Sequence, residues 1–254
     1  MKNLIDLTGK HILVIGASSG IGRQTAVTLS SVGAKLTLVA RREDSLKEAV
    51  GELEGTGHAY IPFDITELSE IGTLMKQVVE KGGPLDGMVY SAGRSMYMPL
   101  HMFKPEKLQQ LFHVNYYAFM ECVRQATRKG RYSHGMRIVG VSSVSSLKGN
   151  KGQLGYSASK AAMDASVRCM ARELADKGVC INTVAPGMTE TAMISEFMNS
   201  VGPDSTSIKE NLGRQYLGII KPDAVAEVIT FLLSPSAGSI TGITLPVDGG
   251  MTTC

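Results

Sequence analysis

The order of apolar and amphipathic stretches constrains the fold of this chain more than any other feature. Short runs rich in valine and isoleucine alternate with longer stretches whose apolar residues recur at helical spacing. The apolar runs are HILVIG (11–16), KLTLVA (35–40), AYIPF (59–63), DGMVYSA (86–92), RIVGVSS (137–143), VCINTVA (179–185) and ITLPV (243–247). The helical stretches lie near 21–32, 43–53, 67–81, 105–129, 156–177 and 222–233. Strands that alternate with helices require right-handed crossovers, and these produce a parallel sheet.

Helices should cover both faces of this sheet. The runs are apolar throughout rather than at every second position, which is typical of strands buried on both sides. No internal repeat or linker divides the chain. We therefore predict a doubly wound, Rossmann-type α/β fold of about seven parallel strands, in which residues 1–254 form a single domain. One segment, 188–220, is rich in methionine, serine and glycine without a clean period, so it is predicted to be a functional loop.

The charge and the cysteines exclude several functional classes. The formal net charge is +3 and the basic residues are scattered, so no nucleic-acid partner is expected. The four cysteines, Cys122, Cys169, Cys180 and Cys254, lie far apart without a CxxC pair, which predicts neither a disulfide framework nor a metal site. The apolar run near the N-terminus is too short for a signal peptide or a membrane span. We therefore expect a cytoplasmic protein.

A glycine-rich turn, VIGASSGIG, joins the first predicted strand to the first predicted helix. Glycines there permit a sharp turn, a close approach of the backbone to a pyrophosphate, and tight packing of helix on strand. The helix N-terminus adds free N–H groups and the positive end of a dipole. The spacing G-x-x-x-G-x-G would also suit a simple tight turn, but its place in the chain favours a dinucleotide site. The predicted contacts are Gly16, Ser18, Ser19, Gly20, Ile21 and Gly22.

The end of the second predicted strand distinguishes between two cofactors. An NAD site usually carries an acidic residue there, which binds the ribose 2′-hydroxyl. This chain reads LVARRED, with Arg41 and Arg42 in that place. Arginines suit a 2′-phosphate because they form charge-assisted, bidentate hydrogen bonds with it. The alternative is a pair of solvent-facing arginines. We predict that NADP(H) is preferred over NAD(H).

The stretch GYSASKAAM (155–163) places Tyr156 and Lys160 four residues apart at the start of a predicted helix. Residues at this spacing share one face of a helix. A tyrosine hydroxyl has a pKa near 10, which is too high for efficient acid–base catalysis at neutral pH. A neighbouring ammonium favours the phenolate and lowers that pKa. The pair is therefore predicted to transfer protons, and the simpler alternative is a surface pair.

Taken in order, these motifs resemble the short-chain dehydrogenase/reductase family, and the resemblance extends over essentially the whole sequence. GASSGIG matches the family's cofactor turn, YSASK its tyrosine and lysine, and ITGITLPVDGG its last strand and tail. SAG (91–93) matches the family's Asn-Asn-Ala-Gly motif, although Tyr90 and Ser91 replace the two asparagines. This departure removes the side-chain contact that usually stabilises the strand, while Ala92 and Gly93 still allow close packing of the adenosine half.

The resemblance implies further cofactor contacts. FDIT (63–66) corresponds to the segment near the adenine, and INTVAPGMTET to the segment beside the nicotinamide carboxamide. Lys160 also hydrogen-bonds the nicotinamide ribose by this analogy. The implied cofactor-binding residues beyond the glycine turn are Arg41, Arg42, Asp64, Ile65, Ser91, Ala92, Gly93, Tyr156, Lys160, Pro186, Gly187, Met188 and Thr189.

The resemblance also implies four catalytic residues. Tyr156 would protonate the substrate oxygen in reduction and accept the proton in oxidation, with Lys160 lowering its pKa. Ser143, in VGVSSVSS, corresponds to the serine that donates a hydrogen bond to the substrate carbonyl. Asn115, in HVNYYAF, corresponds to the asparagine that holds a water near the lysine. A serine that only caps a turn, or an asparagine that only packs, is the structural alternative for each of the last two.

The implied activity is NADP(H)-dependent transfer of a hydride between a nicotinamide and a carbonyl or secondary alcohol. The sequence is most similar to 3-oxoacyl carrier-protein reductases, so reduction of a 3-oxoacyl thioester is expected. Enzymes that act on steroids, sugars or small alcohols share every motif. A non-catalytic redox sensor would typically lack the tyrosine or the lysine, and both are present. A sugar-nucleotide epimerase would typically have a different glycine spacing and a larger C-terminal region.

Substrate and partner contacts are less well defined by the sequence. Methionine and aromatic residues in 94–103 and 188–220 predict a partly apolar substrate. A carrier protein would dock on basic residues near the entrance of the site. The family commonly forms a homotetramer or homodimer through the helices that correspond to 105–129 and 156–177, so either assembly is expected. The candidates for the basic docking surface are Arg128, Lys129, Arg131 and Arg172.

Overall fold

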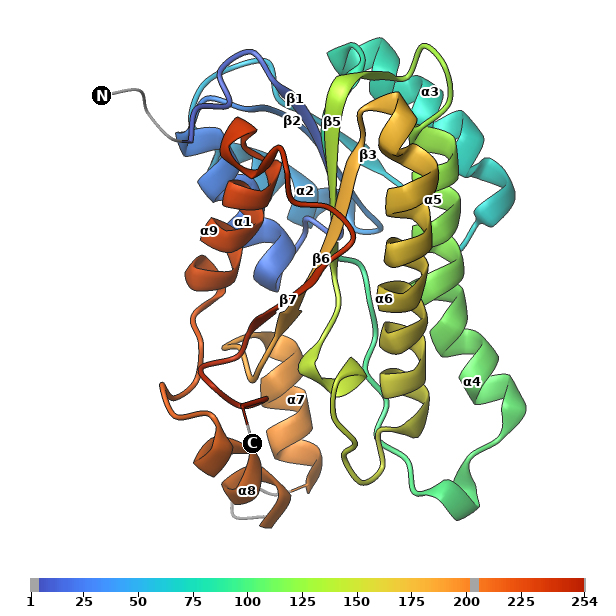
Figure 1. Ribbon diagram of the computed structural model, residues 1–254, viewed down its shortest axis with the longest axis vertical. Helices are drawn as coiled ribbons and strands as arrows, with labels where there is room; N and C mark the ends of the chain where they lie inside the picture. Colours follow the sequence, from blue (N-terminus) through green and yellow to red (C-terminus); the bar gives the residue numbers. More distant parts are fainter. Residues whose placement is uncertain (1–4, 202–205, 254) are drawn as a thin grey trace.

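Parallel strands form the centre of the molecule (Figure 1). The computed structural model describes residues 5–201 and 206–253, and in this part of the chain seven strands form one sheet. The strands are β1 (His11–Ile15), β2 (Lys35–Ala40), β3 (Ala59–Pro62), β4 (Leu85–Tyr90), β5 (Tyr132–Val141), β6 (Cys180–Pro186) and β7 (Thr244–Val247). Their order is β3-β2-β1-β4-β5-β6-β7, and each neighbouring pair is parallel. The predicted doubly wound, single-domain fold is confirmed.

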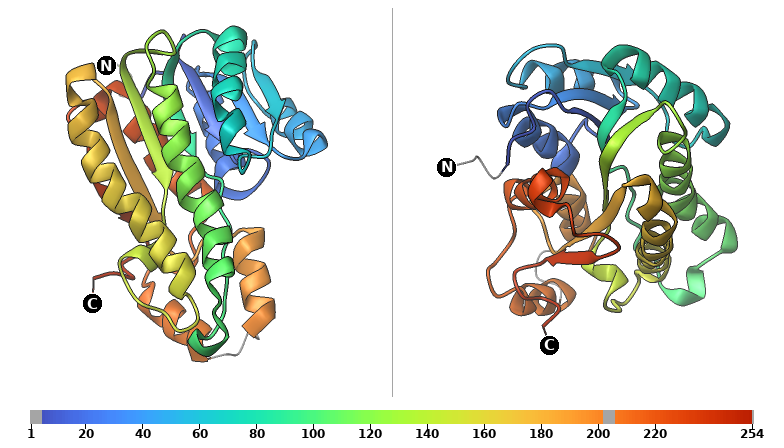
Figure 2. Two further views of the ribbon diagram at one scale, coloured as in Figure 1. Left: turned by 90° about the vertical axis from the view of Figure 1, so that its right-hand side faces the viewer. Right: turned by 45° about the horizontal axis from the view of Figure 1, so that its top comes forward.

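A layer of helices covers each face of the sheet (Figure 2). Leu29 and Ile229 are buried in the core on one face, and Phe119 and Met163 in the core on the other. Strand β1 buries all of its residues between the two layers, as its unbroken apolar run predicts. The first layer consists of α1 (Gly20–Ser31), α2 (Glu43–Gly51) and α9 (Pro222–Leu233). The second contains α3 (Ile71–Gly82), α5 (Ala118–Ala126) and α6 (Leu154–Leu174).

The helix predicted near 105–129 is interrupted by a wider turn. Helix α4 (Pro105–Phe112) passes into a π-helical turn, η3 (His113–Tyr117), and then into α5. A π-turn inserts one extra residue, so it rotates the side chains on either side of it relative to each other. Asn115 lies in this turn and is fully buried. Sequence periodicity alone did not indicate the interruption.

The segment 188–220 contains helices where a loop was predicted. They are α7 (Ala192–Val201) and α8 (Thr206–Arg214), and residues 202–205 of the predicted segment lie outside the described residues. In α7, Ile194, Phe197 and Met198 recur at helical spacing and are half-buried, whereas Met193 is exposed. Three buried apolar positions in so short a helix are too few to show a clear helical periodicity in the sequence.

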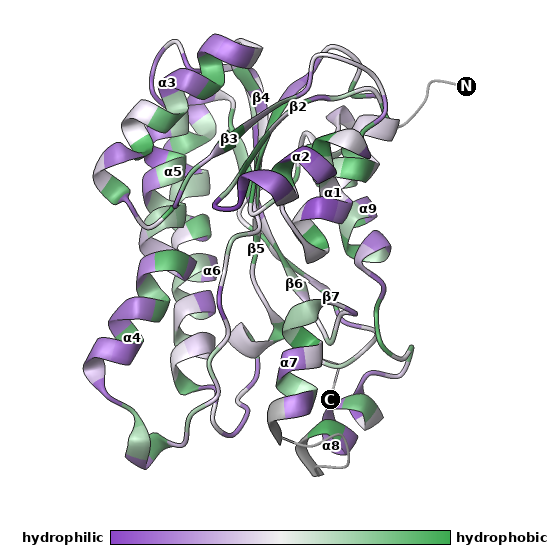
Figure 3. Ribbon diagram, turned by 180° about the vertical axis from the view of Figure 1, so that it is seen from behind, coloured by the Kyte–Doolittle hydropathy of each residue, from purple (hydrophilic) through white to green (hydrophobic). Residues whose placement is uncertain are grey.

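The distribution of hydropathy follows the layers (Figure 3). The strands at the centre of the sheet are mostly hydrophobic, whereas hydrophobic and hydrophilic residues alternate along the helices. Within the described residues, no helix combines the length and apolar character needed to cross a membrane.

The strand order changes direction between β1 and β4, which are neighbours in the sheet. From β1 the chain continues to β2 on one side, and from β4 it continues to β5 on the other side. Doubly wound sheets bind their ligands at this switch point.

Candidate active site

A cavity of about 960 Å³ lies at the carboxyl ends of the strands. Its walls come from the turn after β1, the ends of β2, β4, β5 and β6, and from α6 and α7. Of the predicted site residues, Gly22 and Asn115 are not part of the lining. The others line it together: Gly16, Ser18, Ser19, Gly20, Ile21, Arg41, Arg42, Asp64, Ile65, Ser91, Ala92, Gly93, Ser143, Tyr156, Lys160, Pro186, Gly187, Met188 and Thr189.

The turn between β1 and α1 requires glycine at two positions. Gly16 has a φ of 84°, and a Cβ at this position would lie 2.6 Å from the backbone nitrogen of Ala92. A Cβ on Gly22 would overlap the carbonyl oxygen of Gly16. The turn therefore packs directly on the end of β4 and leaves no room for a side chain.

The N-terminus of α1 opens onto the cavity and fits the phosphates of a dinucleotide. Ser19 is the N-cap residue, but its side chain makes no capping hydrogen bond. The first N–H groups of the helix are thus left for a ligand. Gly20 and Ile21, which begin the helix, line the cavity, and no acidic side chain lies in the first turn. These N–H groups and the helix dipole attract an anion.

At the next two strand ends, basic and acidic side chains lie near each other. Arg41 and Arg42 follow β2 and are exposed in the cavity wall. Asp64 follows β3 and accepts hydrogen bonds from the backbone nitrogen and the hydroxyl of Thr66, at 3.0 and 2.7 Å. Burial acts to raise the pKa of Asp64, but the Thr66 hydrogen bonds and the charge of Arg41 outweigh it and lower that pKa. Arg41 therefore acts on the carboxylate of the neighbouring strand.

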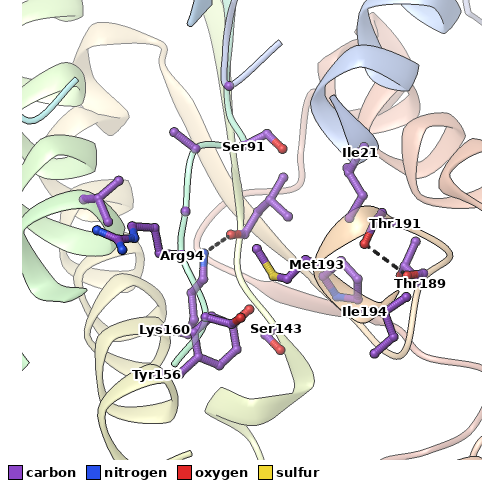
Figure 4. A pocket seen from close by; sticks show the side chains of 18 of the residues that line it. Ile21, Ser91, Arg94, Ser143, Tyr156, Lys160, Thr189, Thr191, Met193 and Ile194 are labelled. Atoms are coloured by element: carbon purple, nitrogen blue, oxygen red, sulfur yellow. Dashed lines mark hydrogen bonds between the residues drawn. The ribbon is translucent and has the colours of Figure 1, made fainter. Parts of the chain in front are cut away.

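The proposed catalytic side chains come from the end of β5 and the start of α6 (Figure 4). Ser143 follows β5, Tyr156 lies in the first turn of α6, and both side chains line the cavity. Lys160 is 4% exposed, and its ammonium lies 5.9 Å from the centre of the Tyr156 ring. Lys160 Nζ donates a hydrogen bond to the carbonyl oxygen of Val141 at 2.7 Å. Tyr156 and Lys160 are therefore not an exposed surface pair.

Burial shifts the protonation of both side chains. It raises the pKa of Tyr156, and the hydrogen bond with Ser143 offsets this only in part. Burial also lowers the pKa of Lys160 to about 8, against the opposing effect of the Asp164 charge. The sequence led us to expect a lowered pKa for Tyr156, and the structure differs because the phenol is itself desolvated. A phenol that is protonated at neutral pH is suited to donate a proton.

Asn115 holds the loop after β4 against α6. Its Oδ1 accepts a hydrogen bond from the backbone nitrogen of Arg94 at 2.9 Å. Its Nδ2 donates to the carbonyl oxygen of Arg94 at 3.0 Å and to Ser159 Oγ at 2.9 Å. A Cβ on Gly93 would lie 3.4 Å from both Asn115 Oδ1 and Lys160 Nζ. Asn115 therefore lies beside the lysine, and both hydrogens of its amide are engaged by protein atoms.

Comparison with known proteins agrees with this arrangement. Residues 16–252 match a family described as enoyl-(acyl carrier protein) reductase. The chain is 34% identical over 247 residues to the 3-oxoacyl-[acyl-carrier-protein] reductase of Vibrio cholerae, which covers 97% of this chain and 99% of that protein. This chain belongs to the short-chain dehydrogenase/reductase family. The resemblance seen in its motifs is thereby confirmed.

Solved structures of short-chain dehydrogenases/reductases share the whole fold. A dehydrogenase/reductase from Sinorhizobium meliloti is similar over 98% of this chain and 97% of that chain, with a TM-score of 0.88 and 29% identity. A variant of the actinorhodin polyketide ketoreductase, solved with NADPH, is similar over 96% of this chain and 98% of that chain, with a TM-score of 0.86 and 28% identity. The chain is therefore an oxidoreductase of this family.

Tyr90 explains how this member of the short-chain dehydrogenase/reductase family compensates for the missing asparagines after β4. Its side chain is fully buried, and its hydroxyl donates a hydrogen bond of 2.5 Å to the carbonyl oxygen of Val114. Its ring packs edge-on against Phe119, with the ring centres 5.4 Å apart. Burial raises the pKa of Tyr90 well above its usual value, so the hydroxyl remains a donor. Tyr90 thus ties the end of β4 to the turn that carries Asn115.

Gln215 was not identified from the sequence, although it fixes the segment after β6. It is 1% exposed, and its Oε1 accepts a hydrogen bond from the backbone nitrogen of Met188 at 2.8 Å. Its Nε2 donates to the carbonyl oxygens of Met188, at 2.9 Å, and Gly218. No sequence signal could have found this residue, because glutamine in a polar stretch is common and the contact joins distant parts of the chain.

The opposite side of the cavity carries aromatic and apolar side chains. Tyr97, in the loop after β4, packs against Phe197 of α7, with the ring centres 5.4 Å apart. A Cβ on Gly152 would lie 2.7 Å from the Tyr97 ring, so the ring also rests on the backbone of the loop before α6. Met193 lines the same side and is partly exposed. The methionine-rich and aromatic stretches of the sequence thus meet at the cavity.

The basic residues suggested for carrier-protein docking do not surround the entrance of the cavity within one chain. Three of them lie between the end of α5 and the start of β5, at the amino ends of the strands: Arg128, Lys129 and Arg131. Arg172 lies in the last turn of α6, whereas Tyr156 lies in the first. Because α6 is 21 residues long, roughly 30 Å separates its two ends. Arg94 and Lys148 are the basic residues that line the substrate side.

Proposed function

We propose that this protein is an NADP(H)-dependent ketoreductase that reduces the 3-oxo group of an acyl thioester, with Tyr156 as the proton donor. The observation that carries the proposal is that Ser143, Tyr156 and Lys160 line the same cavity as the glycine turn. A carbonyl oxygen placed beside both hydroxyls would accept two hydrogen bonds. The similarity to proteins named 3-oxoacyl-[acyl-carrier-protein] reductases supports the choice of a thioester.

The proposed cofactor site extends from the glycine turn to the end of β6. The N–H groups at the start of α1 would hold the pyrophosphate, and the side chains of Arg41 and Arg42 the 2′-phosphate. The segment that begins at Pro186 would hold the nicotinamide end. When bound, NADPH supplies the hydride that the carbonyl carbon receives. Glycine and serine form the cavity wall at the turn after β1, which leaves room for the pyrophosphate there.

The protein's own part in the reaction is to orient the carbonyl and to supply a proton. Ser143 Oγ would donate a hydrogen bond to the carbonyl oxygen and stabilise the negative charge that develops there. Tyr156 would transfer its hydroxyl proton to this oxygen, which becomes an alcohol, and would itself become a phenolate. The ammonium of Lys160 would stabilise that phenolate until a proton from solvent restores the phenol. In oxidation the same steps run in reverse.

Asn115 is proposed to support the proton path rather than to touch the substrate. Its side chain holds the loop that contains Gly93, and the lysine ammonium lies near the same glycine. Because both amide hydrogens are engaged, a water beside Lys160 would bind to oxygen atoms of this region. The family resemblance implies that Asn115 itself holds this water.

Other substrates remain as alternatives. Steroids, sugars and small alcohols would be oxidised or reduced by the same hydroxyl pair. The apolar contacts of Tyr97, Phe197 and Met193 favour an acyl chain over a sugar. Enoyl reduction is a second candidate because the matching family carries that description. A non-catalytic dinucleotide sensor is disfavoured because Tyr156 and the buried Lys160 lie together in the cavity wall, an arrangement that such a protein would not need.

A cytoplasmic homodimer or homotetramer is the assembly we propose, with the acyl group presented on a carrier protein or as a free thioester. Met120 of α5 and Cys169 of α6 are exposed on the outer side of the second helix layer, where a second copy would pack. The thiols of Cys122, Cys169 and Cys180 are free, as a reducing compartment allows. Sedimentation analysis of the purified protein measures the assembly.

Turnover of a substrate panel tests the proposed function. NADPH consumption should be measured with an acetoacetyl thioester, a diketone, a steroid ketone, a keto-sugar and a crotonyl thioester. We expect the acetoacetyl thioester to give the highest kcat/KM and the crotonyl thioester to give none. Reduction of the crotonyl thioester without reduction of any ketone would replace the proposal with enoyl reduction.

The cofactor preference is tested by Arg41→Ala. Loss of a charge-assisted hydrogen bond to the 2′-phosphate should raise the KM for NADPH by about tenfold or more, while the KM for NADH changes little. Lys47→Ala is the matched control, because Lys47 is an exposed cation on α2 that pairs with Glu43. Equal effects of Arg41→Ala on the two cofactors would contradict the predicted preference for NADP(H).

A further inference from the structure

Three consecutive residues at the end of β5 contact three residues of α6 that are spaced four apart. The strand end (residues 141–143) supplies a backbone carbonyl to Lys160 and a hydroxyl to Asp164 as hydrogen-bond partners, and the Ser143 hydroxyl acts on the pKa of Tyr156. Residues four apart lie on one face of a helix, so this face of α6 is aligned along the strand end. The contacts to Tyr156 and Lys160 belong to the proposed reaction. The contact to Asp164 has not been given a role.

Asp164 is a buried carboxylate whose oxygens are both hydrogen-bonded. The side chain is 4% exposed. Its Oδ2 accepts from Ser142 Oγ at 2.9 Å, and its Oδ1 accepts from Thr183 Oγ1 on β6 at 2.7 Å. Within residues 5–201 and 206–253, no basic side chain forms an ion pair with it. A buried charge without a direct ionic partner is costly, so a packing role alone would be better served by an apolar side chain.

The surroundings of Lys160 contain few other charges. On α6 itself, Tyr156 and Asp164 are the titratable neighbours at helical spacing. The side chains that β5, β6 and the turn after β5 present to this face are neutral hydroxyls, among them those of Ser142, Ser143 and Thr183. On η3, His113 binds the carbonyl oxygen of Thr66 and Tyr116 pairs with Ser166, while Arg94 follows Gly93 on the loop beyond. Asp164 is the charged group that acts on the pKa of Lys160.

We propose that Asp164 is a positioning residue for the proposed reaction: its buried carboxylate keeps Lys160 protonated and anchors the strand end that carries Ser143. The inference rests on the proposed function, because it assumes that the ammonium of Lys160 stabilises the Tyr156 phenolate. Asp164 touches neither substrate nor cofactor, since it does not line the cavity. It acts through Lys160 and through Ser142.

The consequence is a wider pH range in which Lys160 carries its charge. Burial lowers the pKa of Lys160 to about 8, and the carboxylate opposes that effect. The charged form of Lys160 therefore predominates below this pH and is lost above it. Without the carboxylate, the same loss would occur at a lower pH. Turnover that needs the ammonium would then fall at neutral and alkaline pH first.

Titration of Lys160 in the cofactor-free protein tests the electrostatic part without relying on activity. In protein labelled with ¹³Cε-lysine, the Lys160 signal is the one that disappears in Lys160→Met. We expect a midpoint close to 8 in the wild-type protein, and a midpoint lower by on the order of one pH unit in Asp164→Asn. Thr183→Val is the matched control. It removes one hydrogen bond to the carboxylate but keeps the charge, so its midpoint should stay near the wild-type value.

Turnover against pH supplies the second readout. With a midpoint lowered by one unit, Asp164→Asn should lose about eightfold in kcat at pH 8.5 and almost nothing at pH 6. The KM for NADPH should change little, because Asp164 lies outside the cavity. A merely structural role would instead lower kcat by a similar factor at every pH. Asp164→Glu, which keeps the charge, should recover part of the alkaline activity.

The outcomes separate this inference from the proposed function. An unchanged Lys160 midpoint in Asp164→Asn would overturn the inference, even if wild-type ketoreduction is found. A wild-type midpoint far below 8 would also overturn it, and this measurement needs no substitution of Asp164, because Lys160→Met serves only to assign the signal. Absence of wild-type ketoreduction would reject the proposed function, while the titration would still report whether Asp164 holds the charge on Lys160.

Discussion

The two walls of the cavity differ in how firmly they are built. The catalytic wall, formed by the strand end and the start of α6, carries buried polar groups such as Ser143 and Lys160, each with a hydrogen-bond partner in the protein. The substrate wall, formed by the loop after β4 and by α7, carries the partly exposed side chains of Tyr97 and Met193. One wall is held by directional contacts, and the other by packing.

This difference reflects two separate physical requirements. Proton transfer depends on donor and acceptor positions that are fixed before the substrate arrives, because small misplacements are costly in rate. Substrate choice depends on shape and apolar contact, which flexible thioether and aromatic side chains can supply to more than one ligand. The comparison predicts that changes in the catalytic wall alter kcat, whereas changes in the substrate wall alter KM.

Ser143→Ala should give the largest effect among the tests of this comparison. Removal of a hydrogen-bond donor to the developing oxyanion should lower kcat by roughly 100-fold with little change in KM. Steady-state kinetics with the acetoacetyl thioester measure both constants. Ser146→Ala is the control, because Ser146 is a neighbouring hydroxyl that does not line the cavity, and kcat should fall by less than about threefold. A similar fall in kcat in the two variants would mean that the Ser143 hydroxyl contributes no more to catalysis than a neighbouring hydroxyl.

Tyr90→Phe tests whether the support behind the catalytic wall matters for stability. The carbonyl oxygen of Val114 would lose its hydrogen bond in a fully buried place, which should lower the free energy of unfolding by about 1–3 kcal/mol. Chemical denaturation measures this change. Tyr60→Phe is the matched control, because its hydroxyl makes a long, exposed contact with Glu43, at 3.4 Å. Equal stability of the two variants would show that the Tyr90 contact contributes nothing beyond packing.

Tyr97→Ala tests the substrate wall. Tyr97 packs on Phe197, and loss of its ring should remove about 1 kcal/mol of apolar contact with the substrate. The KM for a medium-length acyl thioester should therefore rise several-fold, with kcat nearly unchanged. Leu100→Ala is the control, because Leu100 is 76% exposed and does not line the cavity. A large fall in kcat with an unchanged KM would mean that this wall positions the reacting group.

The smallest expected effect is a pH dependence of stability due to His11. This residue lies far from both walls, at the amino end of β1. Burial lowers the pKa of His11, in part offset by a hydrogen bond with Gly83. The folded state therefore favours the neutral ring, and stability present above pH 6.5 should decline slightly as the pH falls below that value. Thermal unfolding between pH 5 and 7.5 measures this, with His11→Gln expected to reduce the slope. If His11→Gln lost as much stability at acid pH as the wild-type protein, the loss would belong to other titratable groups.

The sequence predicted the parallel sheet of about seven strands and most of the residues that line the cavity, because these depend on local patterns. Each strand is one apolar run, and glycine turns and strand ends fall at the same edge of a parallel sheet. What the sequence did not predict depends on contacts between distant residues. The bond from Tyr90 to Val114, the clamp of Gln215 on Met188 and the burial of Asp164 leave no periodic signal.

The direction of the Tyr156 pKa shift is the clearest example of this limit. The spacing of Tyr156 and Lys160 identified the pair, since four residues place them on one helix face. It did not reveal that Lys160 is buried and Tyr156 half-buried, and desolvation raises the pKa of Tyr156 while lowering that of Lys160. Desolvation depends on the whole surrounding fold, so it cannot be inferred from spacing.

Turnover and cofactor binding by Tyr156→Phe, measured on the same preparation, test the central claim most directly. The variant lacks the proposed proton donor but keeps the ring that lines the cavity. We predict that kcat for ketone reduction falls by at least about 100-fold, while the Kd for NADPH, followed by its fluorescence, changes by less than about threefold. Retention of most of the wild-type kcat would contradict the assignment of Tyr156 as the proton donor.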